Sequence, residues 1–362
     1  VGRMKSVLIG VGQAGGKVVD ALSDFDARNG FGAVVGTLAV NSARSDLQSL
    51  PMDTVLIGGS RVNGHGVGGD NELGTQVMRE DVQEVLGAID GRVTARAEAI
   101  FVVAGLGGGT GSGGAPYLVK ELQRIYDVPV YGLGILPGRD EGSLYQVNAG
   151  RSLKTLTREA DATLLVDNDA WRSAGESLES GYEAINERIA RRAGLLLAAG
   201  EAVDGVGESV VDSSEVINTL RGGGVATLGY ASAEAADDAG ANVNVVTSTT
   251  RRALRSGLSL PDTTSAERGL LVVAGRPDTI SRKGVERARS WLETELDTME
   301  VRGGDFPLSD GRLAALVLLG GVANSDRLDG FLERARQAAR EEAQKEEDAA
   351  SAFEEDRIDG LL

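Results

Sequence analysis

The sequence predicts an α/β protein with a doubly wound, mostly parallel sheet, a long central helix and a second, smaller α/β domain. Two observations support this fold class. Apolar segments of strand length alternate with helical segments over about the first 170 residues, as in parallel strands joined by crossover helices. The segment 99–104 (AIFVVA) is apolar throughout, which is typical of a parallel strand covered on both faces.

The first half of the chain carries the pattern of the larger domain. Strands are expected at 5–10, 33–40, 54–57, 99–104, 128–135 and 162–166. Helices are expected at 18–25, 72–89 and 143–156, and a further helix should begin near Pro116 after a Gly-rich segment. The Gly-rich segment 58–70 reads as a loop.

The second half begins with the central helix, from Tyr182 to about residue 199, followed by a loop at 204–207 and a short helix from Asp212 to Leu220. Strands are then expected at 225–230, 269–274 and 314–320, and helices at 233–254 and 280–296. Residues 341–362 hold nine acidic residues against two basic ones. We expect this end to be a helix that frays into a tail, either solvated or docked on a protein partner.

The composition excludes several classes of protein. The length of 362 residues is enough for two or three domains, and a hydrophobic content of 41% is too high for wholesale disorder. The absence of Cys excludes a disulfide framework. A net charge of −17 without a basic run argues against nucleic-acid binding. The longest apolar runs are far shorter than the ~20 residues of a membrane-spanning helix, and no secretory signal precedes the first strand. We therefore expect a cytoplasmic protein that is not a membrane protein.

The charged residues have a second property, because only six of the 37 basic residues are Lys. Strong acidity with scarce Lys is typical of proteins that work in concentrated salt, where charge repulsion is screened over a Debye length of about 3 Å at 1 M. An acidic protein of ordinary salt with an acidic tail is the alternative interpretation.

The first Gly-rich motif, GVGQAG at 10–15, matches G-x-G-x-x-G between a predicted strand and helix. Such a turn brings backbone amides close to a phosphate. A dinucleotide site would also need an acidic residue after the second strand, where this chain has Val40, Asn41 and Ser42, so a dehydrogenase is disfavoured. Lys17 is followed by Val18 rather than Ser or Thr, which excludes a Walker A loop.

The second motif is GLGGGTGSGGAP at 105–116, in which seven of the first ten residues are Gly. It lies directly between a buried strand and a helix, which argues against a flexible linker. Successive amides of such a segment can point at one anion, and Thr110 and Ser112 add hydroxyl donors. The pattern predicts a nest for a di- or triphosphate.

GGGTGSG at 107–113 is the signature of the tubulin/FtsZ GTPase superfamily, which this sequence resembles over about residues 4–322. With GQAGG at 12–16 it looks most like CetZ, the tubulin-like family of haloarchaea, in agreement with the salt-adapted composition. The resemblance implies a GTP-binding domain at 4–178, a central helix and catalytic seventh loop at 179–221, a C-terminal activation domain at 222–322 and an acidic tail at 323–362.

The resemblance also implies nucleotide contacts at individual positions. The first loop would hold the α- and β-phosphates, the third loop (66–71) would sense the γ-phosphate, and the fifth and sixth loops would hold the ribose and the guanine. In that order along the chain the contacts are Gly12, Gln13, Ala14, Lys17, Asn41, Gly68, Gly69, Gly107, Gly108, Gly109, Thr110, Gly111, Ser112, Gly113, Glu141 and Asn168. His65 is expected to be a solvated loop residue, with a nucleotide contact as the alternative.

Tyr182 and Asn186 lie four residues apart on the central helix and so share one of its faces. An aromatic ring and a carboxamide at this spacing can stack on a purine and hydrogen-bond its edge together. The superfamily has the same aromatic-x-x-x-Asn pattern, so the resemblance places both side chains at the base. A surface Tyr with an incidental Asn is the alternative.

Asp212 and Glu215 form a D-x-x-E pattern that has two interpretations. It fits a helix capping box, and the resemblance makes the same two carboxylates catalytic, acting on the γ-phosphate of the next subunit's nucleotide. FtsZ has an Asn at the position of Val210, a difference that would slow hydrolysis.

Together these features predict an assembly-dependent GTPase with GTP or GDP and Mg²⁺ as cofactors, forming head-to-tail filaments that control cell shape or motility, with protein partners for the tail. No side chain is assigned to a metal ion. A nucleotide-regulated scaffold with little hydrolysis and an FtsZ-like division protein are the alternatives.

Overall fold

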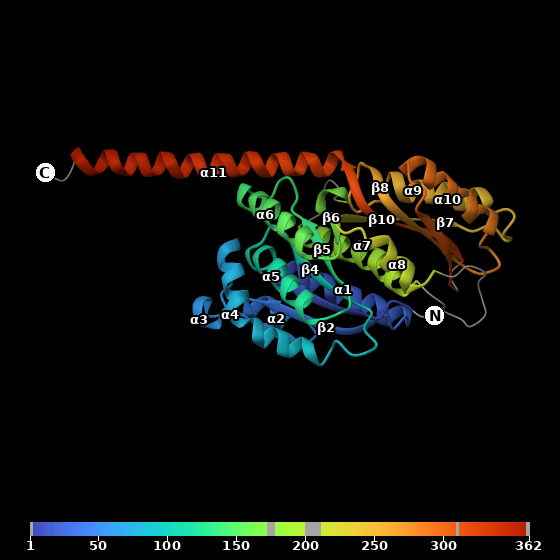
Figure 1. Ribbon diagram of the computed structural model, residues 1–362, viewed down its shortest axis with the longest axis horizontal. Coiled ribbons are helices and arrows are strands. Elements are labelled where there is room, and N and C mark those ends of the chain that lie inside the picture. The colour runs from blue at the N-terminus through green and yellow to red at the C-terminus, as the bar shows by residue number, and fades with distance from the viewer. Residues whose placement is uncertain (1–2, 172–177, 200–210, 309–310, 360–362) are drawn as a thin grey trace.

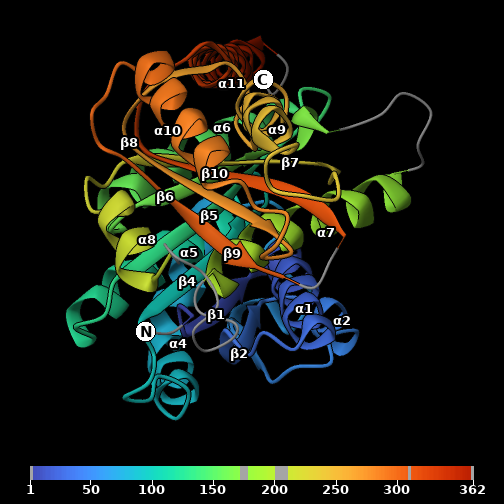
Figure 2. The same cartoon turned by 90° about the vertical axis from the view of Figure 1, so that its right-hand side faces the viewer.

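The computed structural model describes residues 3–171, 178–199, 211–308 and 311–359. Within these ranges the strands form one ten-stranded sheet in the order β3-β2-β1-β4-β5-β6-β7-β10-β8-β9, and Figure 2 shows helices on both of its faces. The strands are β1 (Ser6–Val11), β2 (Val34–Asn41), β3 (Thr54–Leu56), β4 (Ala99–Gly105), β5 (Val130–Leu136), β6 (Thr163–Asp167), β7 (Val225–Glu234), β8 (Thr263–Gly275), β9 (Val301–Pro307) and β10 (Arg312–Ser325).

The sheet has a parallel and a mixed part. Strands β1 to β6 are parallel, and the chain order reverses at β1, which pairs with β2 on one side and β4 on the other. Strand β7 joins β6 in parallel through only two residue pairs, and β10 is antiparallel to both β7 and β8. The predicted doubly wound, mostly parallel sheet with a second, smaller α/β part is confirmed.

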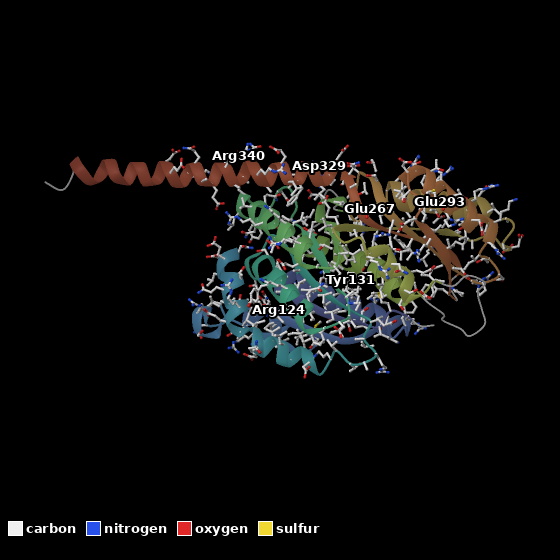
Figure 3. All side chains as sticks on the ribbon, in the orientation of Figure 1. Arg124, Tyr131, Glu267, Glu293, Asp329 and Arg340 are labelled. Atoms are coloured by element: carbon white, nitrogen blue, oxygen red, sulfur yellow. The ribbon has the colours of Figure 1, made fainter. Side chains whose placement is uncertain are left out.

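Two helical layers explain why the predicted strand at 99–104 is apolar throughout. In β4, Phe101 and Val103 face the core shared with α1 (Gly12–Asn29), α7 (Leu178–Ala198) and α8 (Ser213–Leu220). Ile100 and Val102 face the core shared with α4 (Asn71–Asp90), α5 (Gly109–Ile125), α6 (Ser143–Glu159) and the start of α11 (Asp326–Asp359). Tyr131 on β5 (Figure 3) belongs to the first of these two cores, where its ring lies 5.2 Å from that of Phe101, and it is 1% exposed.

The smaller part has its own core between β8, β10, α9 (Val243–Arg255) and α10 (Arg282–Leu296). Here the structure corrects two expectations. The helix predicted at 233–254 begins only at Val243, because β7 continues to Glu234 and a turn fixed by the buried Asn242 follows it. The second correction is strand β9, which was not predicted. In the larger part, α2 (Arg44–Gln48), α3 (Gly59–Val62) and the 3₁₀ turn η1 (Asn168–Ala170) were not predicted either, and α3 lies within the segment 58–70 that was expected to be a loop.

The C-terminal end also differs from the expectation. Helix α11 runs without interruption to Asp359, so the predicted fraying of the segment 341–362 into a tail is wrong as far as that segment is described, to residue 359. Figure 1 shows that α11 extends past the rest of the chain, while its first turns pack on α6. The predicted loop at 204–207, Val210 and the two C-terminal leucines lie outside the described residues. No helix in the described part is long and apolar enough to cross a membrane.

Candidate functional site

The candidate site lies where the strand order reverses, at the carboxyl ends of β1 and β4, which is where open α/β sheets bind ligands. Glycines bring the two strand-to-helix connections into contact there. A Cβ atom on Gly12, whose φ is +76°, would lie 2.9 Å from the amide nitrogen of Gly111. A Cβ atom on Gly15 would lie 2.2 Å from the carbonyl oxygen of Val103. These positions therefore have no room for a side chain.

The Gly-rich signature segment is more helical than the sequence predicts. Helix α5 begins at Gly109, so only the residues before it form a loop. The reason is close helix packing, because a Cβ atom on Gly113 would lie 2.1 Å from the carbonyl oxygen of Asn71 at the start of α4. A Cβ atom on Gly109 would lie 2.9 Å from the amide nitrogen of Asp70. The glycines thus let α5 begin against the third loop.

Helices α1 and α5 both begin at the site without a capping side chain. Val11 and Gly108 precede them and make no side-chain cap, and neither first turn contains an acidic residue. Helix α4 differs, because Asp70 accepts a hydrogen bond from the Leu73 amide at 2.9 Å. Uncapped first-turn amides and the positive end of the helix dipole favour an anion. A Cβ atom on Gly68 or Gly108 would meet nothing within 4 Å, so the backbone is open at both positions. We call the first turns of α1 and α5 with loop 66–71 the phosphate cradle.

The two hydroxyls of the signature segment join the loops of the cradle. The Oγ1 atom of Thr110 lies 2.7 Å from the Oγ atom of Ser42 in a buried hydrogen bond. The Nδ2 atom of Asn71 donates to the Oγ atom of Ser112 at 2.8 Å, and Ser112 is 1% exposed. Their donation to a phosphate stays a prediction, while the structure gives them a role in fixing the second and third loops.

Asn148 on α6 is a residue that the sequence analysis missed. It is 1% exposed, and its Nδ2 atom donates to the carbonyl oxygens of Gly69 at 2.7 Å and Gly107 at 3.0 Å. It therefore ties the third loop to the signature segment. The available signal was a carboxamide between Val147 and Ala149, on the apolar face of the predicted helix.

The second loop is fixed by Asn41, which is 3% exposed. Its Oδ1 atom accepts from the Ser42 amide at 2.8 Å, and its Nδ2 atom donates to Asp46 at 3.0 Å. The exposed His65 lies on the neighbouring loop, as expected for a solvated histidine. Asn41 thus positions the residue that bonds to Thr110.

The predicted ribose and guanine residues follow β5 and β6. Glu141 is half-buried, and its Oε1 atom accepts from the Gly138 amide at 2.7 Å. Asn168 begins η1 directly after β6 and is 8% exposed. Beside it, burial raises the pKa of Asp167 to about 6. The two predicted residues thus lie at the carboxyl edge of the sheet, next to a buried carboxyl group.

Arg327, at the start of α11, is a second residue that the sequence analysis missed. Its guanidinium pairs with Asp167 and, at 2.9 Å, with Asp169, so it brackets Asn168. The arginine is separated from these carboxylates by about 160 positions, and no local pattern joins them. Helix α11 is thereby anchored at the predicted guanine side of the site.

The central helix lies beside α1, and a groove of about 940 Å³ opens between them. Lys17 and Asn186, two predicted nucleotide contacts far apart in the sequence, both line this groove. Tyr182 lies one turn earlier on α7 and is 39% exposed. Gln13 and Ala14 are exposed in the first turn of α1. The structure therefore brings the first-loop residues and the central-helix residues to one side of the cradle.

Asp212 and Glu215 have the geometry of a cap. The Oδ1 atom of Asp212 accepts from the Glu215 amide at 3.2 Å and from the Ser214 hydroxyl at 2.5 Å. Burial, and then the charge of Asp212, raises the pKa of Glu215 above its ordinary value. The capping interpretation of the pair is confirmed, and it leaves two adjacent carboxyl groups at the start of α8.

This carboxylate pair lies far from the cradle. The Ser213 hydroxyl donates to Glu98 at 2.7 Å, and Glu98 accepts from the Lys5 amide at 2.9 Å. Helix α8 is thus fixed at the amino ends of β1 and β4, whereas the cradle lies at their carboxyl ends. The seven residues of β4 separate the two sites by roughly 20 Å at ~3.3 Å per residue.

Comparison with known proteins places the whole chain. A family model for the tubulin/FtsZ family GTPase domain matches residues 5–175, and one for the tubulin-like CetZ C-terminal domain matches residues 175–337. Tubulin-like protein CetZ2 of Haloferax volcanii is 68% identical over 99% of this chain and 100% of that protein. Tubulin-like protein CetZ of Pyrococcus abyssi is 32% identical over 99% and 96%.

The solved structures agree. CetZ2 from Haloferax volcanii, solved as a GTPγS-bound protofilament, superposes with a TM-score of 0.91 at 68% identity, covering 94% of this chain and 100% of that one. An FtsZ dimer of M. jannaschii, at 23% identity, shares the fold with a TM-score of 0.71 and covers 88% and 89%. This chain therefore belongs to the tubulin-like CetZ family of the tubulin/FtsZ superfamily.

Proposed function

We propose that this protein binds GTP in the phosphate cradle and hydrolyses it in head-to-tail filaments, where Asp212 and Glu215 of the next subunit complete the site. The observation that carries this proposal is the separation of roughly 20 Å between the cradle and the carboxylate pair, at opposite ends of β4. One chain does not bring them together, whereas two chains stacked head to tail do. Such a heterologous contact repeats without closing and so forms filaments.

The described residues fit a guanine nucleotide. The first-turn amides of α1 and α5, including those of Gln13 and Ala14, would face the phosphates, with Lys17 beside them. Glu141 would hold the ribose, and Asn168 and Asn186 would read the base. GTPγS in the protofilament of Haloferax CetZ2 supports this assignment.

The proposed chemistry is phosphoryl transfer to water. Asp212 and Glu215 would orient the attacking water, and the cradle amides would stabilise charge on the phosphates. Mg²⁺ bound to the phosphate oxygens would neutralise developing charge. Among the residues that the structure describes, no group of three or more His, Cys, Asp or Glu forms a metal site, so a metal ion would be held chiefly by the nucleotide.

GTP turnover per subunit, measured against protein concentration in molar KCl, tests this proposal. The rate should rise with concentration as interfaces form, and a flat rate would overturn the interface mechanism. Asp212→Ser is the sharper variant, because serine still caps α8 while the carboxylate is lost. It should retain GTP and lose turnover.

A nucleotide-regulated scaffold is the second candidate, because the Asp212 carboxylate already accepts two hydrogen bonds within its own turn. Unchanged turnover in Asp212→Ser would favour it over the GTPase.

We further propose that the filaments act in the cytoplasm on cell shape or motility. Depletion should change cell shape and leave division intact, whereas arrested division would favour an FtsZ-like role. The domain division at 4–178, 179–221, 222–322 and 323–362 belongs to the same proposal. The acidic residues 341–359 of α11, which projects beyond the body (Figure 1), are the segment proposed for protein partners.

A further inference from the structure

A pocket of about 180 Å³ lies between α4, α5 and α6, next to the phosphate cradle. Asn71 and Ser112, whose side chains are hydrogen-bonded to each other at 2.8 Å, form part of its wall. The remaining wall comes from Thr75 on α4, from Gly113 and the middle of α5, and from the second half of α6. The pocket therefore shares Asn71, Ser112 and Gly113 with the predicted nucleotide-binding segments, while its cationic residues come from the helices behind them.

The lining of this pocket is positive in a strongly negative chain. The lining contains three cationic side chains and one carboxylate, which are those of Lys120, Arg151, Arg158 and Glu159. Arg158 pairs with Glu159 at 2.9 Å. For the side chains of Lys120 and Arg151 the described part of the chain provides no ion pair or hydrogen bond. Two exposed cations without a partner among the described residues thus line one concave surface.

Ser152 is an independent sign of a ligand. It lines the pocket between the two cationic positions of α6 and is 2% exposed. Its Oγ atom is buried and has no hydrogen-bond partner among the described residues. A buried hydroxyl without a partner is unfavourable, so the structure leaves a donor to be satisfied from the pocket.

We propose that this pocket binds the phosphoryl group of a small anion, separately from the nucleotide. Two ammonium or guanidinium groups and a buried hydroxyl provide several donors at different angles, which suit the oxygens of a tetrahedral phosphate. Ionic attraction alone is screened at molar salt, and direct hydrogen bonds in a concave site are not. The phosphoryl group has two sources, free phosphate or a phosphorylated metabolite.

Titration of the GDP-loaded protein with inorganic phosphate in molar KCl, followed by calorimetry, tests the proposal. Bound GDP fills the nucleoside and the α- and β-phosphate positions but leaves the γ-phosphate position open, so the second site is reported by the phosphate binding that depends on Lys120 and Arg151. We expect one saturable site per chain. The double variant Lys120→Gln, Arg151→Gln should weaken binding at least about tenfold, as expected for losing charged hydrogen bonds. Lys154→Gln, which removes an exposed cation of α6 outside the pocket lining, should leave it unchanged.

Three results would overturn the proposal: no saturable binding, full binding by the double variant, or equal loss in Lys154→Gln. Retained GDP and an unchanged melting curve show that the variants are folded and that the nucleotide site is intact. A failure of the phosphate-site proposal is then distinguishable from a failure of the proposed GTPase. If the double variant loses GDP, Ser152→Ala decides, with severalfold weaker phosphate binding expected and unchanged binding contradicting the proposal. Glycerol 3-phosphate in parallel separates the sources: binding of phosphate alone assigns the pocket to free phosphate, and binding of both assigns it to a phosphoryl group.

Discussion

Replacing Asn148 by alanine should weaken GTP binding without any direct contact to the nucleotide. The side chain makes two hydrogen bonds, a partly buried one to the carbonyl oxygen of Gly69 and a buried one to that of Gly107. At ~1 kcal/mol for each bond, the free energy that holds the two loops in their ordered conformation falls by about 2 kcal/mol. If the nucleotide has to restore that order, its dissociation constant rises about 10- to 30-fold. GTP should suffer more than GDP, because Gly69 lies in the loop assigned to the γ-phosphate.

Gln146→Ala is the matched control for this variant. Gln146 lies on the same helix and is 6% exposed, and its Nε2 atom also donates to two carbonyl oxygens, those of Gly138 and Glu141. These bonds order the fifth loop and leave the third loop untouched. The assay is the dissociation constant of fluorescent GTP and GDP analogues for each variant, together with its melting temperature. If both variants lower the melting temperature but neither changes the ratio of GTP to GDP affinity, Asn148 does not order the γ-phosphate loop.

Three further predictions concern packing, pH and the α11 anchor. Gly113→Ala should destabilise the protein by about 1–3 kcal/mol or more in chemical denaturation, because the new methyl group would meet backbone atoms of α4. The control Gly87→Ala, at a position with open space around it, should be neutral or stabilising. GTP turnover should fall as the pH is lowered, because the half-buried Glu215 must be ionised and burial raises its pKa above its ordinary value. A pH profile centred below the ordinary pKa of a glutamate, about 4.3, would contradict the role. Arg327→Ala leaves the buried carboxylate of Asp167 without its ion pair and should lower the free energy of unfolding by about 3–5 kcal/mol. The control Arg336→Ala, in an exposed pair on the same helix, should lower it by less than about 1 kcal/mol. Equal losses of stability in thermal denaturation would refute the anchoring role.

The sequence was sufficient for elements with one dominant pattern. Continuous apolar runs located the parallel strands, and the predicted central helix lies within α7 almost to its end. Strand β9 was missed because its sequence, VRGGDFP, has two glycines and a proline, and because it lies at the edge of the described sheet, where it pairs with β8. The signature segment was read as a loop because glycine normally disfavours helices, and only the approach of α4 explains why α5 begins there.

The site was predictable where its residues belong to a local motif and hidden where they act at a distance. The cradle segments follow from glycine spacing after strands. Asn148 and Arg327 could not be found in this way, because one bonds backbone atoms of two other loops and the other meets carboxylates some 160 positions away. Helix α11 was underestimated because its charge suggested a solvated tail, although its Ala, Arg, Glu and Gln residues are strong helix formers.

The central claim, that a neighbouring subunit completes the catalytic site, is tested most directly by mixing two proteins in a single turnover. Asp212→Ser loaded with γ-labelled GTP carries a hydrolysable nucleotide but lacks the carboxylate. Wild-type protein loaded with GTPγS carries the carboxylates, and excess free GTPγS prevents it from capturing released label. We predict rapid release of labelled phosphate from this mixture and little from Asp212→Ser mixed with GTPγS-loaded Asp212→Ser. Equal release from the two mixtures would contradict the account.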